Sequence, residues 1–261
     1  MMRILVTNDD GVAAPGLAVA EAIAADIAGP DGEVWVAAPA FEQSGMSHAI
    51  TFTSPIKVEQ LAAHRFACAG TPADCVILAV CHFMRSSPPD LVISGVNRGH
   101  NIAEDAVYSG TVGAAIEAVL QGVPGIALSQ YFRQAPPGVD DWDVFSSAKA
   151  EGVGIVRALL DQPQTPDLFY NVNFPPVQAR DVKGVRVAPQ GRRRRGPFQA
   201  EERRSPGGRS YFWVRGTEDN FSSASDSDSF LCADGYVTIV PMRPDYTDYK
   251  ALELLGASVN R

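Results

Sequence analysis

The first half of the chain alternates between strand-like and helix-like segments, and this alternation restricts the fold more than any other feature. The predicted strands are short β-branched or apolar runs at residues 3–7, 33–37, 90–94 and 125–129. The predicted helices have helical spacing and lie at residues 15–28, 71–84, 109–121 and 145–160. Strands that alternate with helices favour an α/β fold with a doubly wound, mostly parallel sheet.

Two helix boundaries carry clear signals. Thr71 is a suitable N-cap, Pro72 fits the first helical position, and Asp74 fits the third, so a helix should begin here. Gly122 and Pro124 follow the helix predicted at residues 109–121 and should stop it.

The second half of the chain reads differently. Its predicted elements are strands at 168–173, 182–187, 211–214 and 236–240, a loop at 221–228 and a terminal helix at 248–255. We expect residues 1–180 to form the α/β core. Residues 181–261 should add a β-hairpin or arm and a closing strand and helix to the same domain.

Charge is distributed unevenly along the chain. Residues 192–215 hold eight arginines against Glu201 and Glu202, a balance of +6 that leaves −14 for the rest of a chain whose net charge is −8. An acidic body with one basic arm is not typical of a general nucleic-acid binder, so we expect no stable nucleic-acid partner. The arm could attract an anionic substrate or an acidic surface.

Composition excludes several classes of protein. Hydrophobic residues make up 46% of the chain and charged residues 20%, which is typical of a globular domain. No apolar run reaches the roughly 18 residues that a membrane span needs, and no leader pattern is visible, so we expect a cytoplasmic protein without a membrane partner. The four cysteines have no zinc-site spacing and are expected to be small buried hydrophobic residues.

Two adjacent acids, Asp9 and Asp10, follow directly on the first predicted strand. In open α/β sheets, ligands bind at the carboxyl ends of strands. Two carboxylates placed there repel each other unless a cation lies between them or one is protonated. Oxygen-rich clusters of this kind suit Mg²⁺ or Mn²⁺. Taken alone, the pair could equally be a helix cap and a solvated acid.

Three further segments follow strands or open helices of the same predicted sheet. Ser44 lies in a Ser/Gly loop that could supply a hydroxyl to a metal, or could be a plain turn. Asn97 follows the strand predicted at residues 90–94 and offers a neutral carbonyl oxygen to a hard cation. Residues 109–111, Ser-Gly-Thr, open a helix whose N-terminus would favour a phosphate. A cation with a phosphate cradle implies phosphoryl chemistry.

These segments together resemble the SurE survival-protein family of nucleotidases, in order and spacing, from about residue 3 to residue 129. The motifs that carry the resemblance are Asn-Asp-Asp-Gly at 8–11, Ala-Pro-Gly at 14–16, Ser-Gly at 44–45, Gly-Thr-Pro-Ala-Asp at 70–74, Ser-Gly-Val-Asn-Arg-Gly-His-Asn at 94–101 and Tyr-Ser-Gly-Thr-Val-Gly-Ala-Ala at 108–115. A looser match continues at 171–175 and 235–237.

The resemblance implies a Rossmann-like core, a C-terminal arm used in dimer or tetramer assembly, and hydrolysis of 5′- and 3′-nucleoside monophosphates. It also implies activity on short polyphosphate in some members, and one Mg²⁺ or Mn²⁺ ion per subunit. The implied site residues are Asp9, Asp10, Ser44 and Asn97 for the metal, with Asp9 and Asp10 also catalytic, and Asn101, Ser109, Gly110 and Thr111 for the phosphate.

Some positions depart from the family pattern. Ala103 and Ala118 stand where glycine is expected, and the arginine run at residues 192–195 is unusually dense. Two other classes of function stay open at this stage. One is a non-catalytic nucleotide- or anion-binding module that uses the same crevice. The other is a polyanion-binding assembly protein that acts through the arginine-rich arm.

Overall fold

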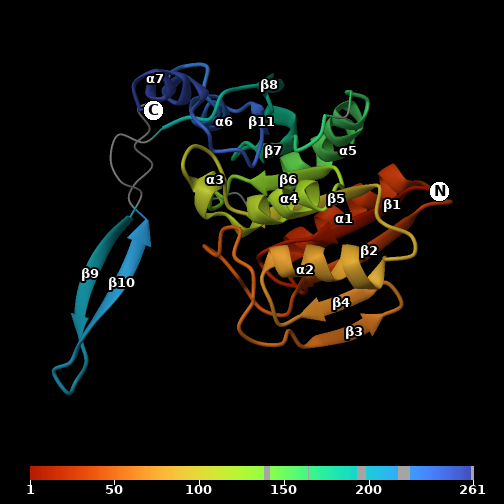
Figure 1. Ribbon diagram of the computed structural model, residues 1–261, viewed down its shortest axis with the longest axis horizontal. Helices are drawn as coiled ribbons and strands as arrows, with labels where there is room; N and C mark the ends of the chain where they lie inside the picture. Colours follow the sequence, from red (N-terminus) through yellow and green to blue (C-terminus); the bar gives the residue numbers. More distant parts are fainter. Residues whose placement is uncertain (138–141, 164, 193–197, 217–223, 260–261) are drawn as a thin grey trace.

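The chain folds around one large sheet with helices on both faces (Figure 1). The computed structural model describes residues 1–137, 142–163, 165–192, 198–216 and 224–259. The strands of the sheet are β1 Arg3–Thr7, β2 Glu33–Pro39, β3 Val58–Ala62, β4 Arg65–Cys68, β5 Leu91–Arg98, β6 Gly125–Gln130, β7 Phe169–Phe174, β8 Val185–Val187 and β11 Val237–Met242. The helices are α1 Pro15–Ala28, α2 Pro72–Leu78, α3 Asp105–Tyr108, α4 Gly110–Leu120, α5 Ser146–Leu160, α6 Asp228–Ala233 and α7 Tyr249–Val259.

The strand order is β3-β4-β2-β1-β5-β6-β7-β11-β8. Strand β1 pairs in parallel with β2 on one side and with β5 on the other. The chain builds outward from β1 through β2 and β4, then returns to start β5 on the opposite side, so the strand order reverses at β1. The antiparallel pairs of this sheet are β3 with β4 and β11 with β7. The predicted α/β fold with a mostly parallel sheet is confirmed.

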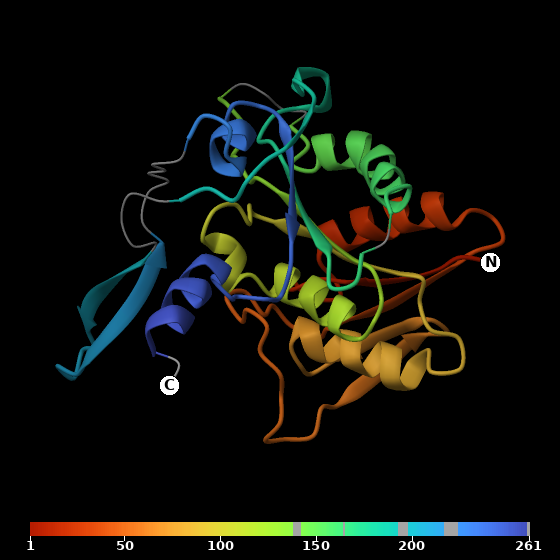
Figure 2. The ribbon, with the colours of Figure 1, turned by 45° about the horizontal axis from the view of Figure 1, so that its top comes forward.

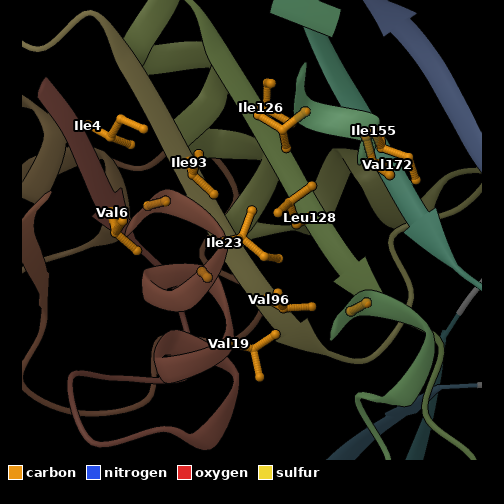
Figure 3. Packing of buried hydrophobic residues seen from close by; sticks show 14 of the residues in the cluster. Ile4, Val6, Val19, Ile23, Ile93, Val96, Ile126, Leu128, Ile155 and Val172 are labelled. Atoms are coloured by element: carbon orange, nitrogen blue, oxygen red, sulfur yellow. The ribbon is translucent and has the colours of Figure 1, made fainter. Parts of the chain in front are cut away.

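Residues on β1 alternate between two hydrophobic layers, as the two-residue period of a strand requires. Ile4 and Val6 pack with α1 and α5, whereas Leu5 packs with α2 and α4. Figure 3 shows part of the first layer, where side chains from β1, β5 and β6 meet Val19 and Ile23 of α1. The two layers hold the central strands rigidly, so their carboxyl ends form a fixed platform.

Most predicted elements of the first half occur within a few residues of their expected bounds. Thr71 caps α2 through a capping box with Asp74, as its sequence predicts, but the helix then widens into a π-helical turn, η1, at Ala79–Phe83. Strand β5 continues to Arg98 rather than ending at Ser94, because pairing with β6 resumes after a shift of register. The pair β3–β4 was not predicted, since every residue of β3 is exposed and shows no alternation.

The second half adds three strands to the same sheet and a separate hairpin. Strand β11 runs between β7 and β8, and the predicted strand at 182–187 shrinks to β8 after a short 3₁₀ turn, η2, at Ala179–Asp181. Residues 224–228 of the predicted loop lead into α6, which was not predicted because its six residues are too short for a helical pattern. Residues 221–223 lie outside the described part. The domain boundary at residue 180 stays a prediction.

Strands β9 (Phe198–Arg204) and β10 (Ser210–Gly216) form a two-stranded antiparallel hairpin that projects from the rest of the molecule in both views (Figures 1 and 2). The strand predicted at 211–214 is thus confirmed. Every residue of β10 is exposed. Glu201 pairs with Arg203 and with Arg215, so two of the hairpin's arginines share one acid. Arg193, Arg194 and Arg195 of the predicted basic arm lie outside the described residues.

Three of the four cysteines, Cys68, Cys75 and Cys232, are buried as expected, and Cys81 is exposed. All four are free thiols. In the described ranges, no helix has both the length and the apolar character needed to cross a membrane.

Candidate active site

A pocket of about 670 Å³ opens beside the ends of β1 and β5, where the strand order reverses. Ligands bind in this place in open α/β sheets. Six of the predicted site residues line this pocket: Asp9, Asp10, Ser44, Asn97, Asn101 and Ser109. The structure therefore brings together side chains that are up to a hundred residues apart in the chain.

Asp9 is held from two directions. Asn8 closes the turn after β1, because its side chain donates to the carbonyl of Gly11 at 2.9 Å and accepts from the Gly11 N–H at 3.2 Å. The Asp9 carboxylate accepts from the Thr111 hydroxyl at 2.6 Å and from the Thr111 N–H at 3.1 Å. A Cβ on Gly110 would lie 2.9 Å from the Cβ of Asp9, so only glycine lets α4 begin this close to the acid.

Thr111 and Gly110 thus contact Asp9 and do not form part of the pocket surface. Thr111 is fully buried, and neither residue is among those that line the pocket. Ser109 does line it, and its hydroxyl caps α4 by accepting from the Val112 N–H at 3.1 Å. The start of α4 therefore lies against Asp9 on its buried side and presents Ser109 to the pocket.

The two adjacent acids share an unfavourable electrostatic environment. Burial raises the pKa of Asp9 to about 6, the bonds from Thr111 oppose the rise, and the charge of Asp10 adds to it. Burial also raises the pKa of Asp10, where the Arg98 N–H lowers it and nearby Glu42 raises it further. A bound cation would relieve the repulsion between these carboxylates.

A bulge in β5 sets the position of Asn97. The register of β5 with β6 shifts between Ser94 and Asn97, and such a bulge re-aims the residues that follow it. Gly95 occurs within this bulge because a Cβ there would lie 2.2 Å from the Leu128 carbonyl oxygen. The Asn97 Nδ2 donates to the Gly99 carbonyl at 3.0 Å, so its Oδ1 is the atom left to bind a cation.

Ser44 lies on an exposed loop that two backbone bonds fasten to the site. The Gln43 N–H donates to the Asp9 carbonyl at 2.7 Å, and the Ser47 N–H donates to the Tyr108 carbonyl at 3.0 Å. The Ser44 hydroxyl donates to Glu42 at 2.8 Å, which leaves its oxygen lone pairs for a cation.

Asn101 is held in place by hydrogen bonds to buried residues of β6 and β7. Its N–H donates to Asn173 at 2.8 Å, its carbonyl accepts from Asn171 at 2.8 Å, and its side chain donates to Ser129 at 2.7 Å. These partners lie on β6 and β7. Asn101 is therefore fixed relative to the same sheet that carries Asp9.

Several pocket residues were not predicted from the sequence. Arg98 lies within the motif that also holds Asn97, so its position gave a usable signal; its guanidinium lies 4.5 Å from the Phe132 ring centre. Glu42 and Asp105 add negative charge to the pocket wall, and Tyr108 and Phe198 add aromatic rings. Phe198 comes from the hairpin, and no local pattern could have placed it here.

The donors that surround this pocket fit a hard divalent cation. In the described part of the chain, no three His, Cys, Asp or Glu side chains cluster closely enough to hold a metal alone. Asp9, Asp10, the Ser44 hydroxyl and the Asn97 amide could hold one together, and all four are oxygen donors. Oxygen donors suit Mg²⁺ or Mn²⁺ and not the thiolate and imidazole sites typical of structural zinc.

Comparisons with known proteins place this chain among relatives that share one name. The family model described as "Survival protein SurE" matches residues 4–197. A protein named 5′-nucleotidase SurE from Cereibacter sphaeroides is 51% identical, over 99% of this chain and 100% of its own length. One of the same name from Ruegeria pomeroyi is 50% identical, over 99% and 100%. Among solved structures, the SurE protein from Aquifex aeolicus is 31% identical, with a TM-score of 0.80 and 98% of each chain covered.

Proposed function

This chain belongs to the SurE family, and from that premise we propose how it acts as a 5′-nucleotidase, a metal-dependent hydrolase of nucleoside monophosphates. One observation carries the proposal. Two neighbouring carboxylates with raised pKa values share a pocket with a hydroxyl, an amide oxygen and the start of a helix. That combination suits a cation and a phosphate together.

The metal would be held by Asp9, Asp10, Ser44 and Asn97. When bound, Mg²⁺ or Mn²⁺ neutralises charge on the phosphoryl oxygens and lowers the pKa of a water molecule. Asp9 is the anchoring acid, because both of its oxygens already accept bonds from Thr111. Asp10 keeps one bond, from the Arg98 N–H at 3.0 Å, and is less buried. Asp10 would therefore orient the water that attacks the phosphorus and accept its proton on the carboxylate. The proton would pass on to the nucleoside oxygen, which leaves as the ester P–O bond breaks.

The phosphate would lie between Asn101 and Ser109 near the start of α4. The helix N-terminus favours an anion there through its dipole. Gly110 contributes by its lack of a side chain and Thr111 by holding Asp9, so their roles in phosphate binding are indirect in this proposal. Arg98 lines the same pocket and adds positive charge for the substrate.

The finer points of function are also proposals. They are Mg²⁺ or Mn²⁺ at one ion per subunit, activity on 3′-monophosphates and short polyphosphate, a homodimer or homotetramer, and a cytoplasmic location. The alternative of a polyanion-binding assembly protein is not favoured, because relatives that match the chain over its whole length, arm included, are named as nucleotidases. A binding module without catalysis is not favoured either, since the relatives are named as enzymes.

Phosphate release from a panel of nucleoside 5′- and 3′-monophosphates and a short polyphosphate would test the proposal. Each substrate is assayed with Mg²⁺, Mn²⁺ and EDTA. We expect release that needs a metal and is abolished in Asp10→Asn, while Asp234→Asn, a surface control, keeps it. Phosphate release that persists in EDTA or in Asp10→Asn would contradict the proposed metal site. No release by folded wild type would contradict the proposed nucleotidase activity.

A further inference from the structure

Ala103 has an unusual backbone conformation beside the pocket. It is fully buried, and its φ is 50°, in the left-handed region that residues other than glycine rarely adopt. Such a residue persists only where its surroundings hold it in place. Ala103 lies in the loop between β5 and α3, two residues from Asn101 and two from Asp105, which both line the pocket.

Both backbone polar groups of Ala103 are held by side chains that are distant in sequence. Its N–H donates to Oδ2 of Asp228 at 3.1 Å, across 125 residues. Its carbonyl accepts from Nε2 of Gln190 at 2.6 Å. The second carboxylate oxygen of Asp228, Oδ1, accepts from the Gly191 N–H at 2.7 Å. Asp228 is fully buried, and its own N–H donates to the Pro189 carbonyl at 2.9 Å.

These contacts come from the two segments that flank the hairpin. Residues 189–192 precede β9, and residues 224–228 follow β10 and lead into α6. The two segments are tied to each other by Asp228, and both are tied to Ala103. We call residues 189–192 and 224–228 the base of the hairpin. The loop at residues 101–105 is thus held at Asn101 by β7 and at Ala103 by the base of the hairpin.

We propose that Asp228, assisted by Gln190, is a positioning residue that holds the loop at residues 101–105 in the geometry that nucleoside monophosphate binding needs. Asp228 acts through Ala103 on Asn101 and Asp105 and does not touch the substrate. The proposal rests on the proposed function for its effect on substrate binding. It also makes the base of the hairpin part of the active-site support.

The chemistry of the contact explains why an aspartate is needed. Two backbone N–H donors, from Ala103 and Gly191, meet two carboxylate oxygens. Asparagine has the same shape but only one acceptor oxygen, so one of the N–H groups would face an N–H₂ group instead. A buried donor without an acceptor is unfavourable, and the loop would shift to relieve it.

The test compares Asp228→Asn, Gln190→Ala and Ala103→Gly, alone and in pairs, with Asp234→Asn as the matched control. Asp234 ends the same helix, α6, but is exposed and pairs with Lys183 on the surface. Two measurements are made. Hydrogen exchange followed by mass spectrometry reports the peptide that covers residues 99–105, and steady-state kinetics with a nucleoside monophosphate and metal report KM and kcat separately.

We expect Asp228→Asn and Gln190→Ala to speed exchange in residues 99–105 and to raise KM roughly 10-fold or more, with a smaller change in kcat. Adding Ala103→Gly to either variant should bring the exchange rate and KM back toward the wild-type values, because glycine adopts the left-handed conformation without support. A general loss of stability would speed exchange throughout the chain and not in this peptide alone. Asp234→Asn should match wild type in both measurements.

Unchanged exchange and unchanged KM in folded Asp228→Asn and Gln190→Ala would overturn the proposal, as would equal losses with and without Ala103→Gly. If Asp228→Asn does not fold, Gln190→Ala with and without Ala103→Gly decides the question, because Gln190 is exposed. Wild type without turnover would overturn the proposed function, and hydrogen exchange would still decide whether Asp228 holds the loop.

Discussion

The pocket and the hairpin are two regions of one chain with opposite physical character. Around the pocket, Asp9 and Thr111 are buried, Asp9 just after strand β1 and Thr111 in the first turn of α4, which packs on the sheet. In the hairpin, Tyr211, Phe212 and Trp213 are adjacent, large and aromatic, yet 46%, 63% and 56% exposed. A core fixes the first region, whereas the second offers surface that proteins usually cover. The difference separates a pocket that a buried core fixes from an extension whose aromatic side chains face solvent.

The largest expected effect separates the two regions by activity. Asp9→Asn should reduce kcat/KM roughly 10²- to 10⁴-fold, because it removes an acid of the proposed metal site while keeping its shape. Trp213→Ser in the hairpin should keep most of the activity. Phosphate release from a nucleoside 5′-monophosphate measures both. A loss from Trp213→Ser as large as that from Asp9→Asn would break the comparison.

Substitutions in the hydrophobic core and in the hairpin should also differ in how far they lower the free energy of unfolding. Ile93→Ala in the first hydrophobic layer should lower the free energy of unfolding by about 2–5 kcal/mol, because it leaves a cavity among side chains that cannot collapse. Trp213→Ser should change it by less than about 0.5 kcal/mol in the monomer, since the side chain is mostly exposed. Urea unfolding at low protein concentration gives both values.

If the stability that Trp213→Ser loses grows with protein concentration, the comparison becomes sharper. It would mean that the hairpin aromatics are covered when copies of the chain associate. Light scattering on the same samples reports the mass of the particles and so provides the control.

The pH dependence of stability tests the charge environment of the pocket. The pKa of Asp9 is about 6 in the folded chain and 3.8 in the reference state, so the folded state holds this proton more tightly. Its contribution to stability is therefore complete below pH 3.8 and is lost as the pH rises through about 6. The loss should approach about 3 kcal/mol in metal-free protein.

Thermal or urea unfolding between pH 4 and pH 7.5, for wild type and Asp9→Asn in EDTA, measures this loss. As the pH rises, the free energy of unfolding of wild type should fall relative to that of Asp9→Asn. Excess Mn²⁺ at pH 7.5 should restore stability to wild type and not to Asp9→Asn. Parallel pH curves for the two proteins would show that Asp9 ionises without penalty.

The smallest expected effect concerns Ala103. Ala103→Gly should stabilise the chain by about 0.5 kcal/mol, because relief of the left-handed conformation slightly exceeds the entropy that glycine adds to the unfolded state. Ala118→Gly is the matched control, since Ala118 lies inside α4, where glycine is unfavourable by about 1 kcal/mol. Urea unfolding of both variants measures the difference, and stabilisation by both would contradict the backbone explanation.

The sequence by itself determined the features that depend on short stretches of chain. The alternation of strands and helices follows from periods of two and of three to four residues. The capping box follows from the three-residue spacing of Thr71 and Asp74, and the two acids after β1 are neighbours in the chain. The convergence of Asp9, Ser44 and Asn97 on one pocket could be expected as well, because parallel strands end on the same edge of a sheet.

Only the tertiary structure decided how those residues are held. The Thr111 hydroxyl turns to Asp9 rather than to the pocket, and Phe198 reaches the pocket from the hairpin. Asp228 reaches Ala103 across 125 residues. Such contacts depend on where distant segments cross, and a local pattern holds no information about that crossing. The residue types were therefore readable in the sequence, whereas their partners came from the packing of the whole chain.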